Sequence, residues 1–175
     1  KYKHMVFHLT IGITSGAFFT DMVRHREDMM RTDEAPIIVE QRFTASVDAV
    51  WNAITEADEM RQWFFDNIPA FEPEVGFETQ FTVTNKGRVF PHRWKVIEAT
   101  PPEKIAYDWQ YDNYSGDAVV TFELSAEGDG TRLKLTYTVL EDFSDDIPEF
   151  ERESGLAGWR YFIQESLKAY VERDQ

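Results

Sequence analysis

The chain contains no cysteine. Disulfide bonds, thiolate metal sites and cysteine nucleophiles are therefore excluded. Because disulfides are typical of oxidising compartments, their absence favours a reducing one, and we expect the protein to reside in the cytoplasm.

Histidine is scarce, and the sequence places it in neither a metal site nor a catalytic site. The four histidines of the chain are His4, His8, His25 and His92. His4 and His8 are four residues apart, but we expect no helix there that would present them as a metal-ligand pair, and no serine lies in a G-x-S-x-G motif. We place His92 on an exposed strand surface. The sequence therefore offers no catalytic residue, no metal site and no cofactor.

The chain has few basic residues relative to acidic ones. It contains 18 Lys and Arg residues and 32 Asp and Glu residues, so its formal net charge is -14. A polyanion repels phosphate backbones, so we expect no nucleic-acid partner. The acidic residues either keep the protein soluble or form a docking surface for a protein partner. A homodimer is a further alternative.

Long apolar runs are also absent. Residues 5–20 contain no Asp, Glu, Lys or Arg, but this stretch is shorter and more polar than the roughly 20 apolar residues of a membrane span. Basic residues outnumber acidic ones within residues 1–31, and the balance reverses afterwards. This shift predicts an N-terminal extension of unknown role at residues 1–36, dispensable for folding through residue 31, and one domain at residues 37–173.

Aromatic residues, in contrast, are abundant. They make up 15% of the chain, within a hydrophobic share of 42%. This composition suits one globular domain whose core needs no disulfide or metal to stabilise it. Large, rigid rings can wall a cavity as well as fill a core.

Period-two alternation predicts six strands. We expect them at residues 37–44, 77–84, 88–99, 104–111, 117–126 and 131–140. Tight turns at residues 85–87 and 128–130 join neighbouring strands into an antiparallel meander. Pro91 lies inside the third strand and indicates an edge position or a bulge there, because proline cannot donate to the ladder.

Three helices complete the pattern. Ser46 suits the N-cap of a short helix that ends near Thr55, and a second short helix covers residues 58–65. The last helix, residues 151–173, repeats apolar residues at steps of three and four and would span about 30 Å. We therefore predict an α+β helix-grip fold: a curved antiparallel sheet of about six strands, closed at one end by the short helices and crossed by the long C-terminal helix.

Several motifs along this order resemble those of a known family. They are Val50-Trp51, Trp63-Phe64, Val96-x-Glu98, Pro101-Pro102, Tyr107-x-Trp109, Val120-Thr121-Phe122, Gly130-Thr131-x-Leu133 and Gly158-Trp159. Their order and spacing over residues 37–173 resemble the AHSA1-like family, named for the activator of Hsp90 ATPase, within the START/Bet v 1-like superfamily. The chain departs from the family pattern at Gly76, where a pair of glycines is common, and at Tyr137, where a histidine is common.

The resemblance implies a cavity between the helix and the sheet. The side chains that would line it are Trp63, Phe64, Phe81, Val96, Tyr107, Trp109, Phe122, Leu135, Tyr137, Trp159 and Ile163. Such a cavity would bind an apolar or aromatic small molecule, with Tyr107, Tyr137 and Trp109 supplying hydrogen bonds at the rim. The same rings could instead simply fill the core.

Three functions therefore stay open. The preferred one is non-enzymatic binding of a hydrophobic small molecule. The alternatives implied by the resemblance are a protein-interaction or co-chaperone-like module and a cyclase- or dehydratase-like enzyme. A titratable group inside the cavity would favour the enzyme, whereas a filled interior with a surface patch would favour the interaction module.

Overall fold

The structure is a computed structural model, of which we describe residues 28–173. The uncharged stretch at residues 5–20 and the three N-terminal histidines lie outside the described residues. Within the described part, no helix is both long enough and apolar enough to cross a membrane.

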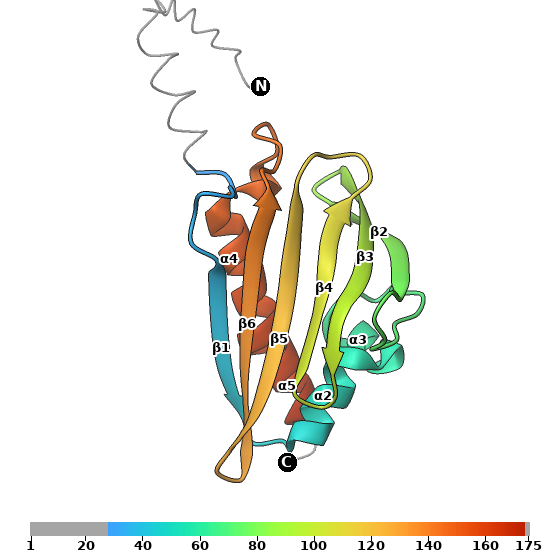
Figure 1. Cartoon of the computed structure of the whole chain (residues 1–175), viewed down its shortest axis with the longest axis vertical. Helices are drawn as coiled ribbons and strands as arrows, with labels where there is room; N and C mark the ends of the chain where they lie inside the picture. The colour runs from blue at the N-terminus through green and yellow to red at the C-terminus, as the bar shows by residue number, and fades with distance from the viewer. Residues whose placement is uncertain (1–27, 174–175) are drawn as a thin grey trace, which may run out of the picture.

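Six antiparallel strands form one curved sheet, as predicted (Figure 1). The strands are β1 (Ile37–Phe43), β2 (Glu78–Asn85), β3 (Arg88–Thr100), β4 (Lys104–Tyr111), β5 (Asp117–Glu127) and β6 (Gly130–Glu141). Their spatial order is β1-β6-β5-β4-β3-β2, so β2 to β6 form a meander and β1 pairs with β6. In that pairing Ile37 lies opposite Tyr137.

The prediction for Pro91 is wrong. Strand β3 lies between β2 and β4, and the irregularity in its pairing with β4 falls between Val96 and Glu98. Pro91 is tolerated because pairing with β4 begins only at His92. Beyond that point the Asp112 amide donates to the Pro91 carbonyl at 3.0 Å, so the proline supplies the acceptor that it still has.

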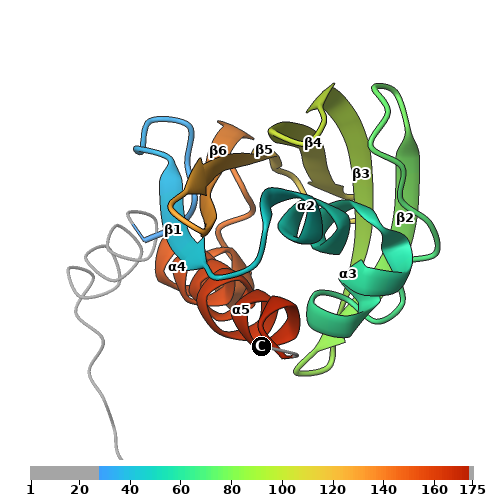
Figure 2. The same ribbon diagram turned by 90° about the horizontal axis from the view of Figure 1, so that it is seen from below.

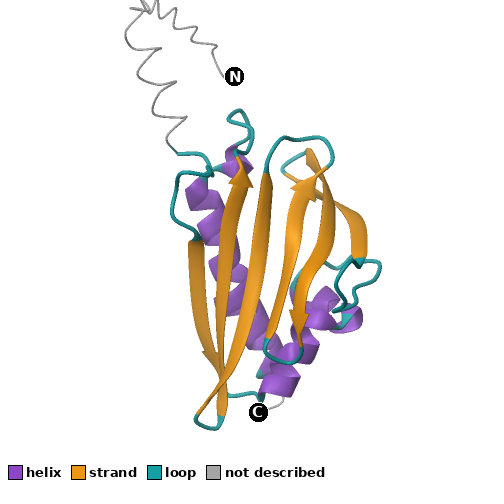
Figure 3. Cartoon of the chain, in the orientation of Figure 1, coloured by secondary structure: helices purple, strands orange, loops and turns teal. Residues whose placement is uncertain are grey.

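Two short helices close one end of the sheet, as predicted. Helix α2 (Val47–Thr55) begins at Ser46, whose hydroxyl accepts from the Ala49 amide at 3.3 Å. Helix α3 (Ala57–Trp63) follows directly. Helix α2 contacts β5 and β6, and all the helices lie on one side of the sheet (Figure 3).

The C-terminal helix is less regular than predicted. It consists of α4 (Arg152–Arg160), a π-helical segment η2 (Tyr161–Leu167) and α5 (Lys168–Val171). Trp159, Ile163 and Leu167 are all buried. Steps of four residues overshoot a 3.6-residue α-helical turn, whereas a π-helical turn is wider. The π-helical segment therefore keeps these side chains on the sheet.

The C-terminal helix lies nearer to the β1 edge of the sheet than to its middle (Figure 2). Both α4 and η2 contact β1, and Figure 2 shows the helix below the β1 edge, away from β2. The remaining concave face is filled largely by aromatic rings. Trp94 of β3 lies among them, with ring centroids 4.7 Å from Phe81, 4.9 Å from Trp109 and 5.0 Å from Tyr107.

The segment before β1 is part of the packed domain. Met29 and Met30 are 0% and 5% exposed. The Met30 amide donates to the Phe150 carbonyl at 3.0 Å, and the Phe143 amide donates to the Met30 carbonyl at 3.2 Å. Contacts with the core therefore begin before residue 37, and they include residues 29 and 30, which the sequence places in a dispensable segment.

Candidate functional site

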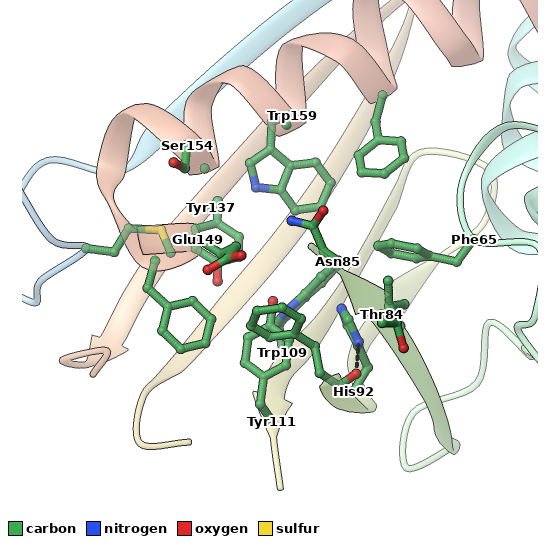
Figure 4. Close-up of a pocket in the computed structure, with 17 residues that line it drawn as sticks. Phe65, Thr84, Asn85, His92, Trp109, Tyr111, Tyr137, Glu149, Ser154 and Trp159 are labelled. Atoms are coloured by element: carbon green, nitrogen blue, oxygen red, sulfur yellow. Dashed lines mark hydrogen bonds between the residues drawn. The ribbon is translucent and has the colours of Figure 1, made fainter. Parts of the chain in front are cut away.

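A cavity of about 350 Å³ lies between the concave face of the sheet and the start of the C-terminal helix. Strands β3, β4 and β6 form its floor, α4 covers it, and the β2–β3 hairpin and the 3-10 turn η1 (Pro148–Phe150) border it. Figure 4 shows the lining side chains converging from these elements. Most of the exposed lining surface is apolar.

Three of the predicted lining residues border this cavity: Trp109, Tyr137 and Trp159. The other predicted residues are buried in the surrounding core instead; they are Trp63, Phe64, Phe81, Val96, Tyr107, Phe122, Leu135 and Ile163. Residues 63 and 64 also border a separate, more polar depression near α3. Much of the expected cavity volume is thus occupied by side chains.

The Trp63–Phe64 pair shows how that volume is filled. The two rings stack with centroids 4.7 Å apart, and Phe64 stacks in turn on Trp94 at 5.5 Å. The Trp63 indole donates to the Ala53 carbonyl at 2.7 Å, which fixes the ring. Ser166 of η2 donates to the Trp63 carbonyl at 2.6 Å and borders the depression near α3 rather than the cavity.

His92 is the most informative residue that sequence reasoning misplaced. It is 4% exposed and lines the cavity, rather than lying on an exposed surface. Period-two alternation contained the signal, because His92 shares its face with the inward residues Trp94 and Val96. The neighbouring charged Arg93 points to the opposite, exposed face.

The His92 ring is held in place on several sides. It stacks on Phe81 with centroids 4.9 Å apart and a 10° interplanar angle, and it meets the Tyr111 ring at 4.7 Å. Its Nδ1 lies 2.9 Å from the Phe90 carbonyl oxygen. Burial lowers the pKa of His92 from 6.5 to about 4, because a charged imidazolium is poorly solvated there. The ring is therefore neutral at pH 7.

Two tyrosines and a tryptophan supply further polar groups. Tyr111 and Tyr137 line the cavity, and burial raises the pKa of both hydroxyls, so they stay protonated. The Trp109 Nε1–H has no hydrogen-bond partner among the described residues. Its proximity slightly offsets the rise in the Tyr111 pKa, although the two groups are not in hydrogen-bonding geometry. Tyr107, also expected at the rim, does not line the cavity, and its buried hydroxyl has no hydrogen-bond partner within residues 28–173.

Two glycines of α4 shape the roof of the cavity. A Cβ at Gly155 would lie 3.0 Å from the Met30 sulfur, so this glycine lets the N-terminal segment pack closely. A Cβ at Gly158 would meet no atom within 4 Å. Close packing therefore does not require a glycine at position 158, which lines the cavity, although glycine destabilises a helix interior relative to alanine.

One ion pair lies at the mouth. Arg88, at the start of β3, binds the Glu149 carboxylate of η1 with an N–O distance of 3.2 Å. Glu149 also lines the cavity. Among residues 28–173, no group of three or more His, Asp or Glu side chains is arranged to hold a metal ion.

Known structures share this fold. Protein CV1439 from Chromobacterium violaceum is 20% identical, with a TM-score of 0.66 over 79% of this chain and 97% of that protein. CalU16 from Micromonospora echinospora is 26% identical, with a TM-score of 0.57 over 79% of this chain and 77% of CalU16. DynU16, from the dynemicin biosynthetic locus, is 22% identical, with a TM-score of 0.64 over 81% of this chain and 49% of DynU16.

No curated protein matches the chain. Residues 44–172 match the family described as activator of Hsp90 ATPase homolog 1-like protein. This match covers most of the helix-grip domain, from the end of β1 to the end of the C-terminal helix. The chain therefore belongs to the AHSA1-like family.

Proposed function

We propose that the protein binds a hydrophobic or aromatic small molecule in the cavity between the sheet and the C-terminal helix. The observation that carries this proposal is the cavity itself, with a volume of about 350 Å³ and mainly apolar walls. Small-molecule sites typically have volumes of about 300–1,000 Å³ and a few polar groups among apolar ones. A small aromatic ligand fits the lower end of that range.

The empty space beside Gly158 supports the same proposal. Cores are normally packed to the density of organic crystals, and voids in them are destabilising. Here the rest of the concave face is filled by rings, while a glycine on α4 leaves space open next to Trp159. A ligand that occupies this space would explain why position 158 of the helix is a glycine.

The test is a fluorescence titration with N-phenyl-1-naphthylamine, a neutral aromatic probe. We expect binding at micromolar concentration, with a rise in probe emission and quenching of tryptophan emission, because Trp109 and Trp159 border the cavity. A dissociation constant of about 1 μM corresponds to roughly 8 kcal/mol of binding free energy.

A pair of adjacent helix positions provides a matched control. Gly158→Leu places a side chain in open space of the cavity, whereas Ala157→Leu adds the same bulk to an exposed position. We expect the first variant to lose the probe and the second to keep it. Equal binding to both variants would place the probe on the surface. If the wild-type protein binds no probe, the protein-interaction alternative becomes the better explanation.

One observation favours the enzyme alternative, since His92 is a titratable group inside the cavity. A general base works best when its pKa lies near the operating pH. The pKa of His92 is about 4, which makes it a weak base at neutral pH. Binding without catalysis therefore remains the proposed function, and single-turnover assays on any identified ligand would distinguish the two.

A further inference from the structure

The His92 imidazole presents a defined chemical group to the cavity. A carbonyl oxygen only accepts hydrogen bonds, so the nitrogen that faces the Phe90 carbonyl, Nδ1, carries the proton. In the neutral ring, Nε2 then holds a lone pair and acts as an acceptor. Figure 4 shows this ring within the cavity, with one nitrogen bonded to the carbonyl and the other free of that bond.

The Nε2 atom has no hydrogen-bond partner among residues 28–173. The ring cannot turn away to find one, because Phe81 stacks on it and Nδ1 is fixed by its own bond. A purely apolar ligand that filled the cavity would exclude water from this acceptor and leave it unpaired, which costs affinity. A ligand that suits the cavity should therefore bring a hydrogen-bond donor to His92.

We infer that the ligand is a hydroxylated aromatic or conjugated molecule, a phenol or an enol, whose hydroxyl donates to His92 Nε2. This inference rests on the binding function proposed above. A hydroxyl suits the site because it accepts as well as donates, and Tyr111 and Tyr137, two further hydroxyl-bearing residues, line the same cavity. Its flat ring suits aromatic walls, which favour stacked and edge-to-face contacts.

The charge of the site argues against an anionic ligand. Glu149 is the one Asp, Glu, Lys or Arg residue among those lining the cavity, and it is paired with Arg88 at the mouth. His92 is neutral because burial lowers its pKa to about 4. A carboxylate ligand would thus meet no cation in the interior, whereas a neutral hydroxyl meets an acceptor.

The experiment compares 2-naphthol with 2-methoxynaphthalene, which has the same rings but no donor. Affinities are measured by tryptophan quenching for the wild-type protein, for His92→Phe and for Ala157→Leu. A neutral hydrogen bond contributes about 1 kcal/mol net, or roughly fivefold in affinity. We expect the preference for naphthol to fall about fivefold or more in His92→Phe and to stay unchanged in Ala157→Leu.

A second measurement needs only the wild-type protein, and so it holds even if His92→Phe folds poorly. In ¹⁵N-labelled protein, the Nε2 resonance of His92 should shift when 2-naphthol binds. Accepting a hydrogen bond changes the electron density of the nitrogen lone pair and with it the chemical shift. It should not shift in the same way with 2-methoxynaphthalene.

The outcomes separate this inference from the proposed function. An unchanged naphthol preference in His92→Phe, or an unmoved Nε2 resonance in saturated wild-type protein, overturns the hydroxyl inference while ligand binding stands. If N-phenyl-1-naphthylamine binds but 2-naphthol and 2-methoxynaphthalene do not, the hydroxyl inference is also overturned while ligand binding stands. If none of the three compounds binds, both fall.

Discussion

The Trp159 indole of α4 meets the Trp109 indole of β4 edge to face, with ring centroids 5.3 Å apart and ring planes at 71°. Both side chains are at most 6% exposed, and both border the cavity. The sequence analysis expected both residues to lie between the helix and the sheet, and the two rings meet there. This contact joins the helix to the sheet beside the proposed ligand, so the same pair serves stability and the cavity wall.

Trp159→Ala should lower the free energy of unfolding by about 3–5 kcal/mol, the usual cost of removing a large buried ring. Urea unfolding measures this change. Tyr161→Ala, on the same helix, is the control: Tyr161 is 54% exposed and should contribute much less. A loss below about 1 kcal/mol for Trp159→Ala would contradict the placement of the helix.

Two N-terminal truncations should differ in stability. Removing residues 1–27 should change the free energy of unfolding little, in line with a dispensable extension. Removing residues 1–31 should lower it by about 2 kcal/mol or more, because Met29 and Met30 are buried and their loss opens the core. Thermal or urea unfolding of both proteins gives the comparison. Equal stability of the two would show that the buried methionines contribute nothing.

His92 should make the protein less stable in acid. Its pKa falls from 6.5 to about 4 on folding, so between these pH values the unfolded chain binds a proton that the folded chain does not. Stability is therefore full above pH 6.5 and is lost as the pH falls towards 4, by about 3 kcal/mol in all. The rings packed around His92, including Tyr111, do not gain charge in this range.

Comparison with His92→Phe isolates this effect, since the carboxylates titrate in both proteins. Unfolding free energies measured from pH 7.5 to pH 4.5 should fall more steeply for the wild-type protein than for the variant. Parallel profiles would show that His92 is not desolvated in the folded protein.

Gly158→Ala should stabilise the protein and weaken ligand binding. The new Cβ meets no atom within 4 Å, and alanine is favoured over glycine in a helix by about 0.5–1 kcal/mol. The same methyl group occupies space in the proposed binding cavity. A rise in melting temperature together with a weaker probe affinity would support a glycine kept for the cavity. Destabilisation instead would indicate a contact at Gly158 that the structure lacks.

Local features of the sequence were sufficient to predict most of the fold. Strand alternation and the turn residues specify the meander, and Ser46 specifies the start of α2, because these signals act between neighbours in the chain. The same alternation also fixes the inward face of His92. The residue is polar and lies beside the exposed Arg93, and composition of that kind is typical of a strand surface, so only the strand period indicates its burial.

The location of the cavity was decided only by the tertiary structure. Sequence patterns indicate which side chains point to the concave face, including Tyr107, Phe122 and Ile163, but not which of them touch one another. The helix lies along β1, and rings such as Phe64 fill the middle of the sheet. The cavity lies instead at the start of the C-terminal helix, where Gly158 of α4 is one of its lining residues. Close packing depends on contacts between elements far apart in the chain, so no local pattern encodes where it leaves a gap.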